Sequence, residues 1–152
     1  MDTKEYNLLE KEICARLPYN LKVQYKLPNY QTNEFDTEEG IAFCVNLGMG
    51  LVDIHGGGID YNISIHKVKP ILRPISSMTK EECDTLFEIL NINEDAGDWL
   101  KINDINVIRL FTQTGKDFYE IAQALNYLHS IQIDYNGLIE EGLAVELKNK
   151  DE

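Results

Sequence analysis

The sequence has few cysteines and no long run of apolar residues. Its three cysteines, Cys14, Cys44 and Cys83, lie far apart and form no C-x-x-C pair, which argues against a secreted disulfide framework and for reduced thiols. No stretch approaches the roughly 18 apolar residues that a membrane-spanning helix needs. The polar N-terminal residues lack the apolar region of a signal peptide. We therefore expect a soluble, cytoplasmic protein.

Positive charge is also scarce. The chain has 14 Lys and Arg against 26 Asp and Glu, a formal net charge of −12, and most of the acidic excess falls in residues 75–152. Because binding to phosphate backbones requires clustered Lys and Arg, and we find no such cluster in the sequence, we expect no direct binding to nucleic acid or membrane. The acidic half fits a basic host or phage protein as partner, or a mimic of nucleic acid. Its simplest interpretation is a solvated face.

Length and pattern predict one α+β domain over residues 1–152. The chain is 43% hydrophobic, enough for one core at this size. Apolar residues at helical spacing predict a helix over 4–17, which Pro18 ends. Alternating or apolar runs predict the following strands: 21–25, 41–47, 51–55 and 59–66. Residues 28–39, rich in Asn, Thr and acids, are expected to form a loop.

Consecutive short strands indicate an antiparallel meander that is strongly bent or barrel-like. After an extended segment, Thr79 and Glu82 form a capping box that begins a helix running to about residue 90. Three further elements are expected: a strand over 105–111, a helix over 117–130 and a short strand over 143–147. Strands followed by helices favour a helix-rich C-terminal half packed on a strand-rich one. A subdomain seam near residue 75 is the alternative to a single unit.

One group of reactive side chains surrounds the triple glycine Gly56–Gly58. If the flanking strands pair, four side chains, which as a set could hold a divalent ion, could approach one another: Asp53, His55, Asp60 and His66. Their spacing matches no known metal motif, so solvent-facing strand positions are the simpler interpretation. The glycines could also approach a phosphate, but the P-loop spacing and its lysine are absent. These are weak candidates, and we predict no metal and no cofactor.

Nucleophilic catalysis has little support in the sequence. Cys44 lies in an apolar strand, where burial would raise the pKa of its thiol and make it inert. Ser76 and Ser77 lack the G-x-S-x-G elbow of serine hydrolases. We therefore predict no catalytic residue, and the pattern favours a protein that is not an enzyme.

Two segments are candidates for protein interaction. Pro70 and Pro74 hold residues 69–79 extended around Arg73, either as a connector or as a preformed edge for a protein partner. Trp99 is either a core residue or an interface anchor. It follows two acidic candidates, Asp95 and Asp98.

Three stretches resemble a set of small uncharacterised proteins that are frequent in phages, prophages and mobile elements of gut Bacteroidetes. They are EICARLPYNLKVQYK (12–26), VKPILRPISSMTKEE (68–82) and LNYLHSIQIDYNGLIEEGLAVEL (125–147), about a third of the chain. Phrases such as ARLPYGVKV, KPYLRPMSSMTEEE and FDYRGLIEKGLA recur in that set in the same order. Residues 27–67 have no recognisable counterpart, and Asn136 stands where an arginine is usual. The resemblance implies a phage or mobile-element origin and a cytoplasmic site in the host, but no activity.

The leading interpretation is a non-enzymatic protein-interaction module that modulates a host or phage protein. The alternative is a small metal- or nucleotide-binding enzyme with its site around the Gly56–Gly58 turn, and the second alternative is an acidic nucleic-acid mimic. The sequence does not determine the oligomeric state, although an exposed edge in the strand-rich half could support a dimer.

Overall fold

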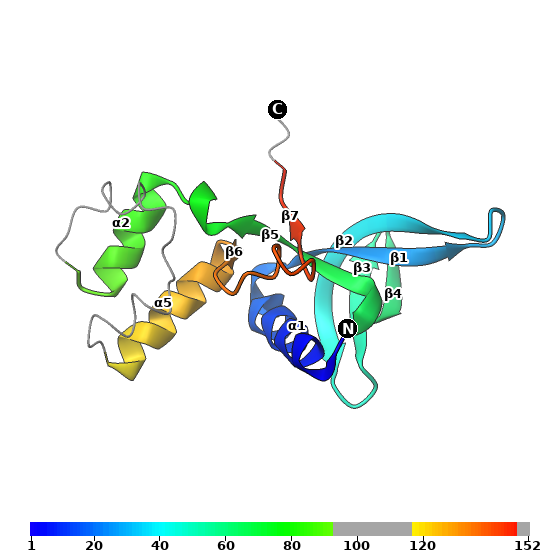
Figure 1. The fold of residues 1–152 in the computed structure, drawn as a ribbon, viewed down its shortest axis with the longest axis horizontal. Helices are drawn as coiled ribbons and strands as arrows, with labels where there is room; N and C mark the ends of the chain where they lie inside the picture. Colours follow the sequence, from blue (N-terminus) through cyan, green and yellow to red (C-terminus); the bar gives the residue numbers. More distant parts are fainter. Residues whose placement is uncertain (93–116, 149–152) are drawn as a thin grey trace. The chain divides into compact units, whose positions relative to one another are not determined.

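A computed structural model describes residues 1–92 and 117–148 (Figure 1). The chain divides into two compact units: unit 1 comprises residues 1–72 and 138–152, and unit 2 comprises residues 73–137. Helices and a mostly antiparallel sheet confirm the α+β class. The strand expected over 105–111 lies outside the described residues. No helix within the described ranges has the length and apolarity needed to cross a membrane.

Unit 1 begins with helix α1, Thr3–Arg16, close to the helix predicted over 4–17. Asp2 caps it, because its side chain accepts a hydrogen bond from the Glu5 backbone N–H at 2.8 Å while Glu5 accepts from the Asp2 N–H at 2.7 Å. This reciprocal pair satisfies two backbone donors that a helix start leaves without partners. Pro18 then lies in a short 3-10 turn, and Asn20 reverses the chain with a φ of 55°.

The strands of unit 1 form an open sheet in the order β4-β3-β2-β1-β5, and β7 pairs in parallel with β5. Their bounds are Lys22–Asn29 (β1), Glu34–Asn46 (β2), Leu51–Gly56 (β3), Ile59–Ser64 (β4), Val68–Pro74 (β5) and Val145–Glu146 (β7). The last two residues of β5 belong to unit 2. The first four strands run antiparallel in sequence order. Neither the barrel-like closure nor the strongly bent meander expected from the sequence is supported, because the strands form an open sheet. Strand β5 occupies the free edge of β1, and β4 pairs with β3 alone among the described strands.

The prediction of a loop over 28–39 is wrong, because most of this segment forms paired strand. The ladder of β1 and β2 continues to the pair Asn29 and Glu34, and this hairpin extends beyond the other strands (Figure 1). The Asn29 side chain accepts from the Gln31 backbone N–H at 2.9 Å, and Asn33 has a φ of 57°. The polar residues thus form a tight turn and two solvated strand ends, which a search for half-buried alternation misses.

The core of unit 1 lies between α1 and one face of the sheet, the inner face. Leu9 and Ile13 of α1 are fully buried among apolar side chains of four strands: Val23, Tyr25, Ala42, Val52, Ile54, Val68 and Leu72. Leu138, Leu143 and Ala144, which follow unit 2 in the sequence, complete the same core. An added Cβ at Gly56 would overlap the Tyr25 hydroxyl, so this position requires glycine.

Cys44 is exposed, contrary to its expected burial. The pairing of β2 with β3 shifts by one residue between Ala42 and Cys44. This bulge breaks the alternation that the apolar run suggests, and it leaves the Phe43 side chain 51% exposed as well. The side chain of Cys44 is therefore accessible to solvent.

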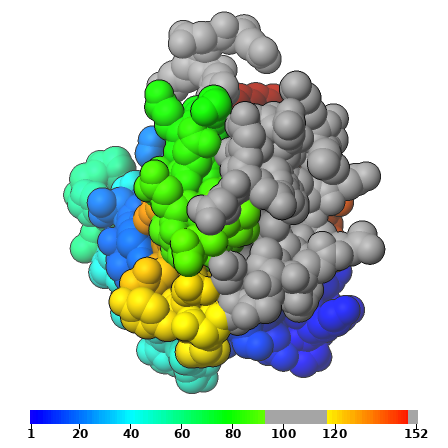
Figure 2. Space-filling model, turned by 90° about the vertical axis from the view of Figure 1, so that its left-hand side faces the viewer, coloured from blue at the N-terminus to red at the C-terminus, as the bar shows by residue number. Residues whose placement is uncertain are grey.

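Unit 2 contains helices α2, Lys80–Ile89, and α5, Phe118–Ser130, and the short strand β6, Ile133–Asp134, which pairs in parallel with the end of β5. The predicted capping box is confirmed, because Thr79 accepts from the Glu82 backbone N–H at 3.2 Å and Glu82 accepts from that of Thr79 at 2.9 Å. Figure 2 shows the two helices side by side. Their apolar faces share a core that includes Cys83, Leu86, Phe87, Leu90, Ala124 and Leu128.

Candidate functional site: a lysine face on the sheet

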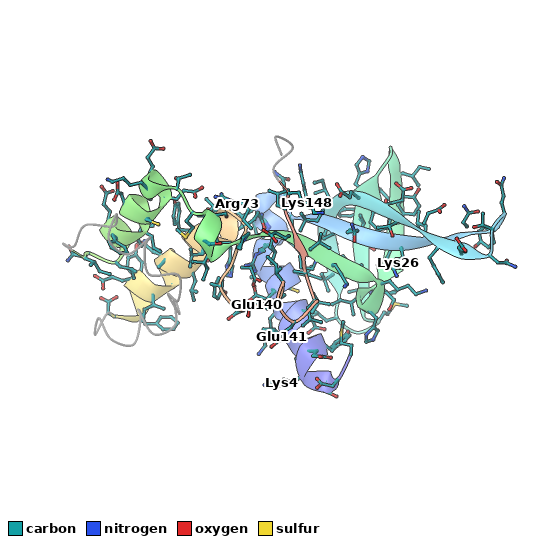
Figure 3. All side chains as sticks on the ribbon, turned by 45° about the horizontal axis from the view of Figure 1, so that its top comes forward. Lys4, Lys26, Arg73, Glu140, Glu141 and Lys148 are labelled. Atoms are coloured by element: carbon teal, nitrogen blue, oxygen red, sulfur yellow. The ribbon has the colours of Figure 1, made fainter. Side chains whose placement is uncertain are left out.

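The face of the sheet opposite α1, the outer face, begins with alternating residues of β1. Val23 and Tyr25 are buried in the core on the inner face. Because successive side chains of a strand point to opposite faces, Lys22 and Lys26 lie on the outer face, and both are exposed. Figure 3 labels Lys26 on this ribbon, apart from Lys4 at the start of α1.

Strand β5 adds two more lysines to the same face. Lys69 lies opposite Gln24, the residue between the two lysines of β1. Lys67 precedes β5, and its Nζ lies 5.0 Å from the centroid of the Phe35 ring, a cation–π distance. Phe35 is also on the outer face. It lies opposite Pro28, which shares its face of β1 with Lys22 and Lys26 because successive side chains alternate. We call Lys22, Lys26, Lys67 and Lys69 the lysine face.

The register places one carboxylate near these charges. Lys22 lies opposite Ile41 and Lys26 opposite Thr37, whereas Glu39, which is exposed on the same face, lies opposite Gln24 and diagonally to both lysines. Within the described ranges, none of the four lysines forms an ion pair. Four exposed positive charges close together attract an anionic group more strongly than scattered lysines do.

Acidic residues collect on the other side of the same face, on β3 and β4. His55 Nδ1 lies 2.6 Å from Asp60 Oδ1, and the side chains are 60% and 68% exposed. Asn62 donates a hydrogen bond to Asp53. The outer face therefore carries carboxylates toward the β4 edge and lysines toward β5, with Glu39 of β2 between them.

The four metal candidates do not converge. The structure pairs His55 with Asp60 and places Asp53 beside Asn62, whereas His66 packs against the Tyr6 ring of α1, with centroids 5.2 Å apart. Across the described residues, no group of three or more His, Cys, Asp or Glu side chains is arranged to hold a metal ion. Asp53, His55 and Asp60 thus occupy solvent-facing strand positions, whereas His66 lies in the 3-10 turn Ile65–Lys67.

The triple glycine has a conformational explanation. Gly57 and Gly58 form the two-residue turn between β3 and β4, with φ angles of 59° and 81°. Positive φ at both central residues is the requirement of the tight hairpin turn that matches strand twist. Together with the close contact of Tyr25 at Gly56, this accounts for all three glycines.

Arg73, a sequence candidate for protein interaction, is engaged within unit 2. Its Nη1 and Nη2 donate to the two carboxylate oxygens of Glu82 at 2.8 and 2.9 Å, and Nη2 also donates to the Ser77 carbonyl at 2.8 Å. The hydrogen bonds from Arg73, aided by the Thr79 N–H, lower the pKa of the Glu82 carboxyl, and the same pairing raises the pKa of Arg73. We call Arg73 and Glu82 the clamp. It ties the end of β5 to the start of α2.

Several acids of unit 2 also have internal partners. Asp84 pairs with Lys80 at 3.0 Å, and the Asp117 side chain caps α5 by accepting from the Glu120 N–H at 2.9 Å. The nucleic-acid mimic, which would need a continuous stripe of free carboxylates, stays a prediction. Trp99, Asp95 and Asp98 lie outside the described residues. The basic partner expected from the acidic half stays a prediction.

The sequence analysis missed the lysine face because its members come from two distant segments. The available signal was the alternation of Lys22, Gln24 and Lys26, and of Lys67 and Lys69, each with a period of two. Only the pairing of β1 with β5 places the two segments side by side. No protein-family model, curated protein or solved structure matches this chain, so the geometry alone must support a function.

Proposed function

We propose that the protein is a non-enzymatic protein-interaction module whose lysine face binds an acidic segment of a partner protein. In line with the resemblance of its sequence, we further propose a phage or mobile-element origin and a partner that is a host or phage protein whose activity it modulates. The observation that carries the proposal is the set of four exposed lysines that lie together without an ion-pair partner.

Charge complementarity selects the class of partner. An acidic segment brings a few carboxylates to the lysines, and Gln24 and Ile41 offer a hydrogen-bonding and an apolar contact between them. The net charge of −12 repels any long polyanion beyond the contact region, so a short acidic segment is favoured over a long anionic polymer of either kind. Since the Debye length is about 8 Å at physiological ionic strength, the binding should weaken markedly as salt rises.

The test compares two double charge reversals in the full chain. Lys22→Glu/Lys26→Glu changes the lysine face, and Lys4→Glu/Lys11→Glu changes two exposed lysines of α1 by the same net charge. The probes are fluorescent ten-residue peptides of glutamate and of lysine and a ten-nucleotide single strand, titrated by anisotropy at low and high salt. We expect the glutamate peptide to bind the wild type, with at least a tenfold loss in the first variant and little change in the second.

Two outcomes would overturn the proposal. Equal losses in both variants would show that net charge alone governs the binding. Tighter binding of the oligonucleotide than of the glutamate peptide would assign the lysine face to nucleic acid. A pull-down from host extract is a further test. A partner protein retained by the immobilised wild type should be lost with Lys22→Glu/Lys26→Glu and kept with Lys4→Glu/Lys11→Glu.

A further inference from the structure

Strand β4 is an edge of the sheet. It pairs with β3 through six residue pairs, Leu51 with Ser64 to Gly56 with Ile59, and with no other described strand. An edge strand presents a row of backbone N–H and C=O groups that can pair with another strand. β4 is therefore a surface on which a further strand could be added.

The hairpin turn determines which backbone groups face outward. In a two-residue hairpin, the residues that flank the turn, Gly56 and Ile59, exchange hydrogen bonds, and bonded and non-bonded pairs alternate from there. Ile59, Tyr61 and Ile63 therefore bond to β3. The backbone groups of Asp60, Asn62 and Ser64 point away from β3, toward the free edge.

This edge lacks the usual protection against pairing. Natural edges are often blocked by charged side chains, especially lysine, by proline or by a bulge. β4 reads Ile-Asp-Tyr-Asn-Ile-Ser, with Asp60 as its one charged residue, and is paired regularly along its whole length. Ile59 is 57% exposed on the inner face, next to Tyr61 and Ile63. A strand added at this edge would cover these apolar side chains.

We propose that β4 pairs antiparallel with β4 of a second copy of this chain, centred on Asn62. In this register Asn62 faces Asn62 of the second copy, and Asp60 faces Ser64, so all three outward residues exchange hydrogen bonds. Tyr61 lies opposite Ile63, an aromatic–aliphatic pair that stabilises sheets. A shift that places Asp60 opposite Asp60 is disfavoured by like-charge repulsion. The sequence of β4 is thus complementary to itself.

The dimer would join two sheets into one. The two-fold axis of an antiparallel strand pair is perpendicular to the sheet, so both outer faces lie on the same side. The two lysine faces then lie at opposite ends of the joined sheet, with the carboxylates of β3 and β4 between them. This inference does not depend on the proposed binding of an acidic partner.

A cysteine scan in a Cys44→Ser background tests the pairing and its register. Directly opposite residues of a bonded antiparallel pair have Cα atoms about 5.5 Å apart, within the range of a disulfide. Asn62→Cys should therefore form a covalent dimer under mild oxidation. Asp60→Cys should form little, because the two cysteines would be offset by four residues, about 13 Å along the strand. Equal cross-linking at the two positions, or none at either, would overturn the proposal.

A second measurement uses sedimentation of the uncrosslinked chain over a range of concentrations. The wild type should dimerise. Asn62→Pro removes an outward N–H without removing a bond to β3, and should be monomeric. Asn62→Thr loses the same hydrogen bond to Asp53 but keeps the N–H, and should still dimerise. A wild type that stays monomeric to several hundred micromolar would contradict the inference. If Asn62→Pro lowers the melting temperature of unit 1, its monomeric state could reflect misfolding, and the disulfide cross-linking of Asn62→Cys and Asp60→Cys then decides whether β4 pairs with itself.

Discussion

The interactions that stabilise unit 1 differ from those that stabilise unit 2. The core of unit 1 is apolar apart from a buried ion pair within α1, Arg16 with Glu12. Its strands bring together residues from both ends of the sequence. In the described part of unit 2, helices α2 and α5 share an apolar core, and a charged pair, Arg73 and Glu82, holds the start of α2. The comparison teaches that unit 1 joins distant parts of the sequence by long-range packing and keeps its buried ion pair within one helix, whereas in unit 2 a charged pair joins two neighbouring elements.

The largest expected effect comes from the two cores. Ile54 of β3 and Leu128 of α5 are both fully buried, and truncating such residues to Ala costs about 2–5 kcal/mol. We expect Ile54→Ala to reduce hydrogen-exchange protection mainly in unit 1, and Leu128→Ala mainly in unit 2. If each variant lowers protection equally in both units, they unfold as one and the comparison fails.

An intermediate effect is expected from the clamp at acid pH. The folded-state pKa of Glu82 is lowered, so its stabilising contribution is fully present above the ordinary glutamate value of about 4.3. It is lost as the pH falls through the lower folded value. Glu82→Gln, which removes the charge, should destabilise α2 near neutral pH by about 1–2 kcal/mol, at the lower end for a hydrogen-bonded charge because the pair is partly exposed.

Amide exchange in α2, corrected for the intrinsic rate at each pH, provides the measurement. The difference between wild type and Glu82→Gln should shrink as the pH is lowered below the folded pKa. Lys80→Ala, which breaks a more exposed ion pair on the same helix, is the control and should have a much smaller effect. A difference that persists unchanged at low pH would show that the charge of Glu82 is not what holds α2.

The smallest effect is expected on the outer face of unit 1. His55 and Asp60 form an exposed pair, and exposed pairs contribute little. His55→Ala should therefore change the free energy of unfolding by less than about 0.5 kcal/mol. Urea unfolding near pH 6 and near pH 8 checks this expectation. A larger loss would mean that the polar face, and not only the core, stabilises unit 1.

Local patterns predicted the elements well. The apolar spacing of α1, the alternation of β4 and the capping box at Thr79 and Glu82 were all confirmed. Each of these signals acts over a few neighbouring residues, so the sequence alone carries them. The short strand β6 was missed, because two residues give no periodicity.

Long-range pairing could not be predicted. Nothing near Lys22 indicates that Lys69 lies beside it, since that depends on β5 returning to β1. The role of Arg73 was likewise hidden, although Glu82 is only nine residues away, because the bidentate geometry arises from the turn at 75–77. The exposure of Cys44 depends on a bulge, which an apolar run does not reveal.

The place of unit 2 in the sequence has a consequence for synthesis on the ribosome. Residues 73–137 emerge before Leu138, Leu143 and Val145, which complete the core and sheet of unit 1. The nascent chain therefore carries an unfinished sheet while the whole of the inserted segment is translated. A ribosome that stalls inside this segment would release a product whose exposed apolar surface makes it a substrate for chaperones or proteases.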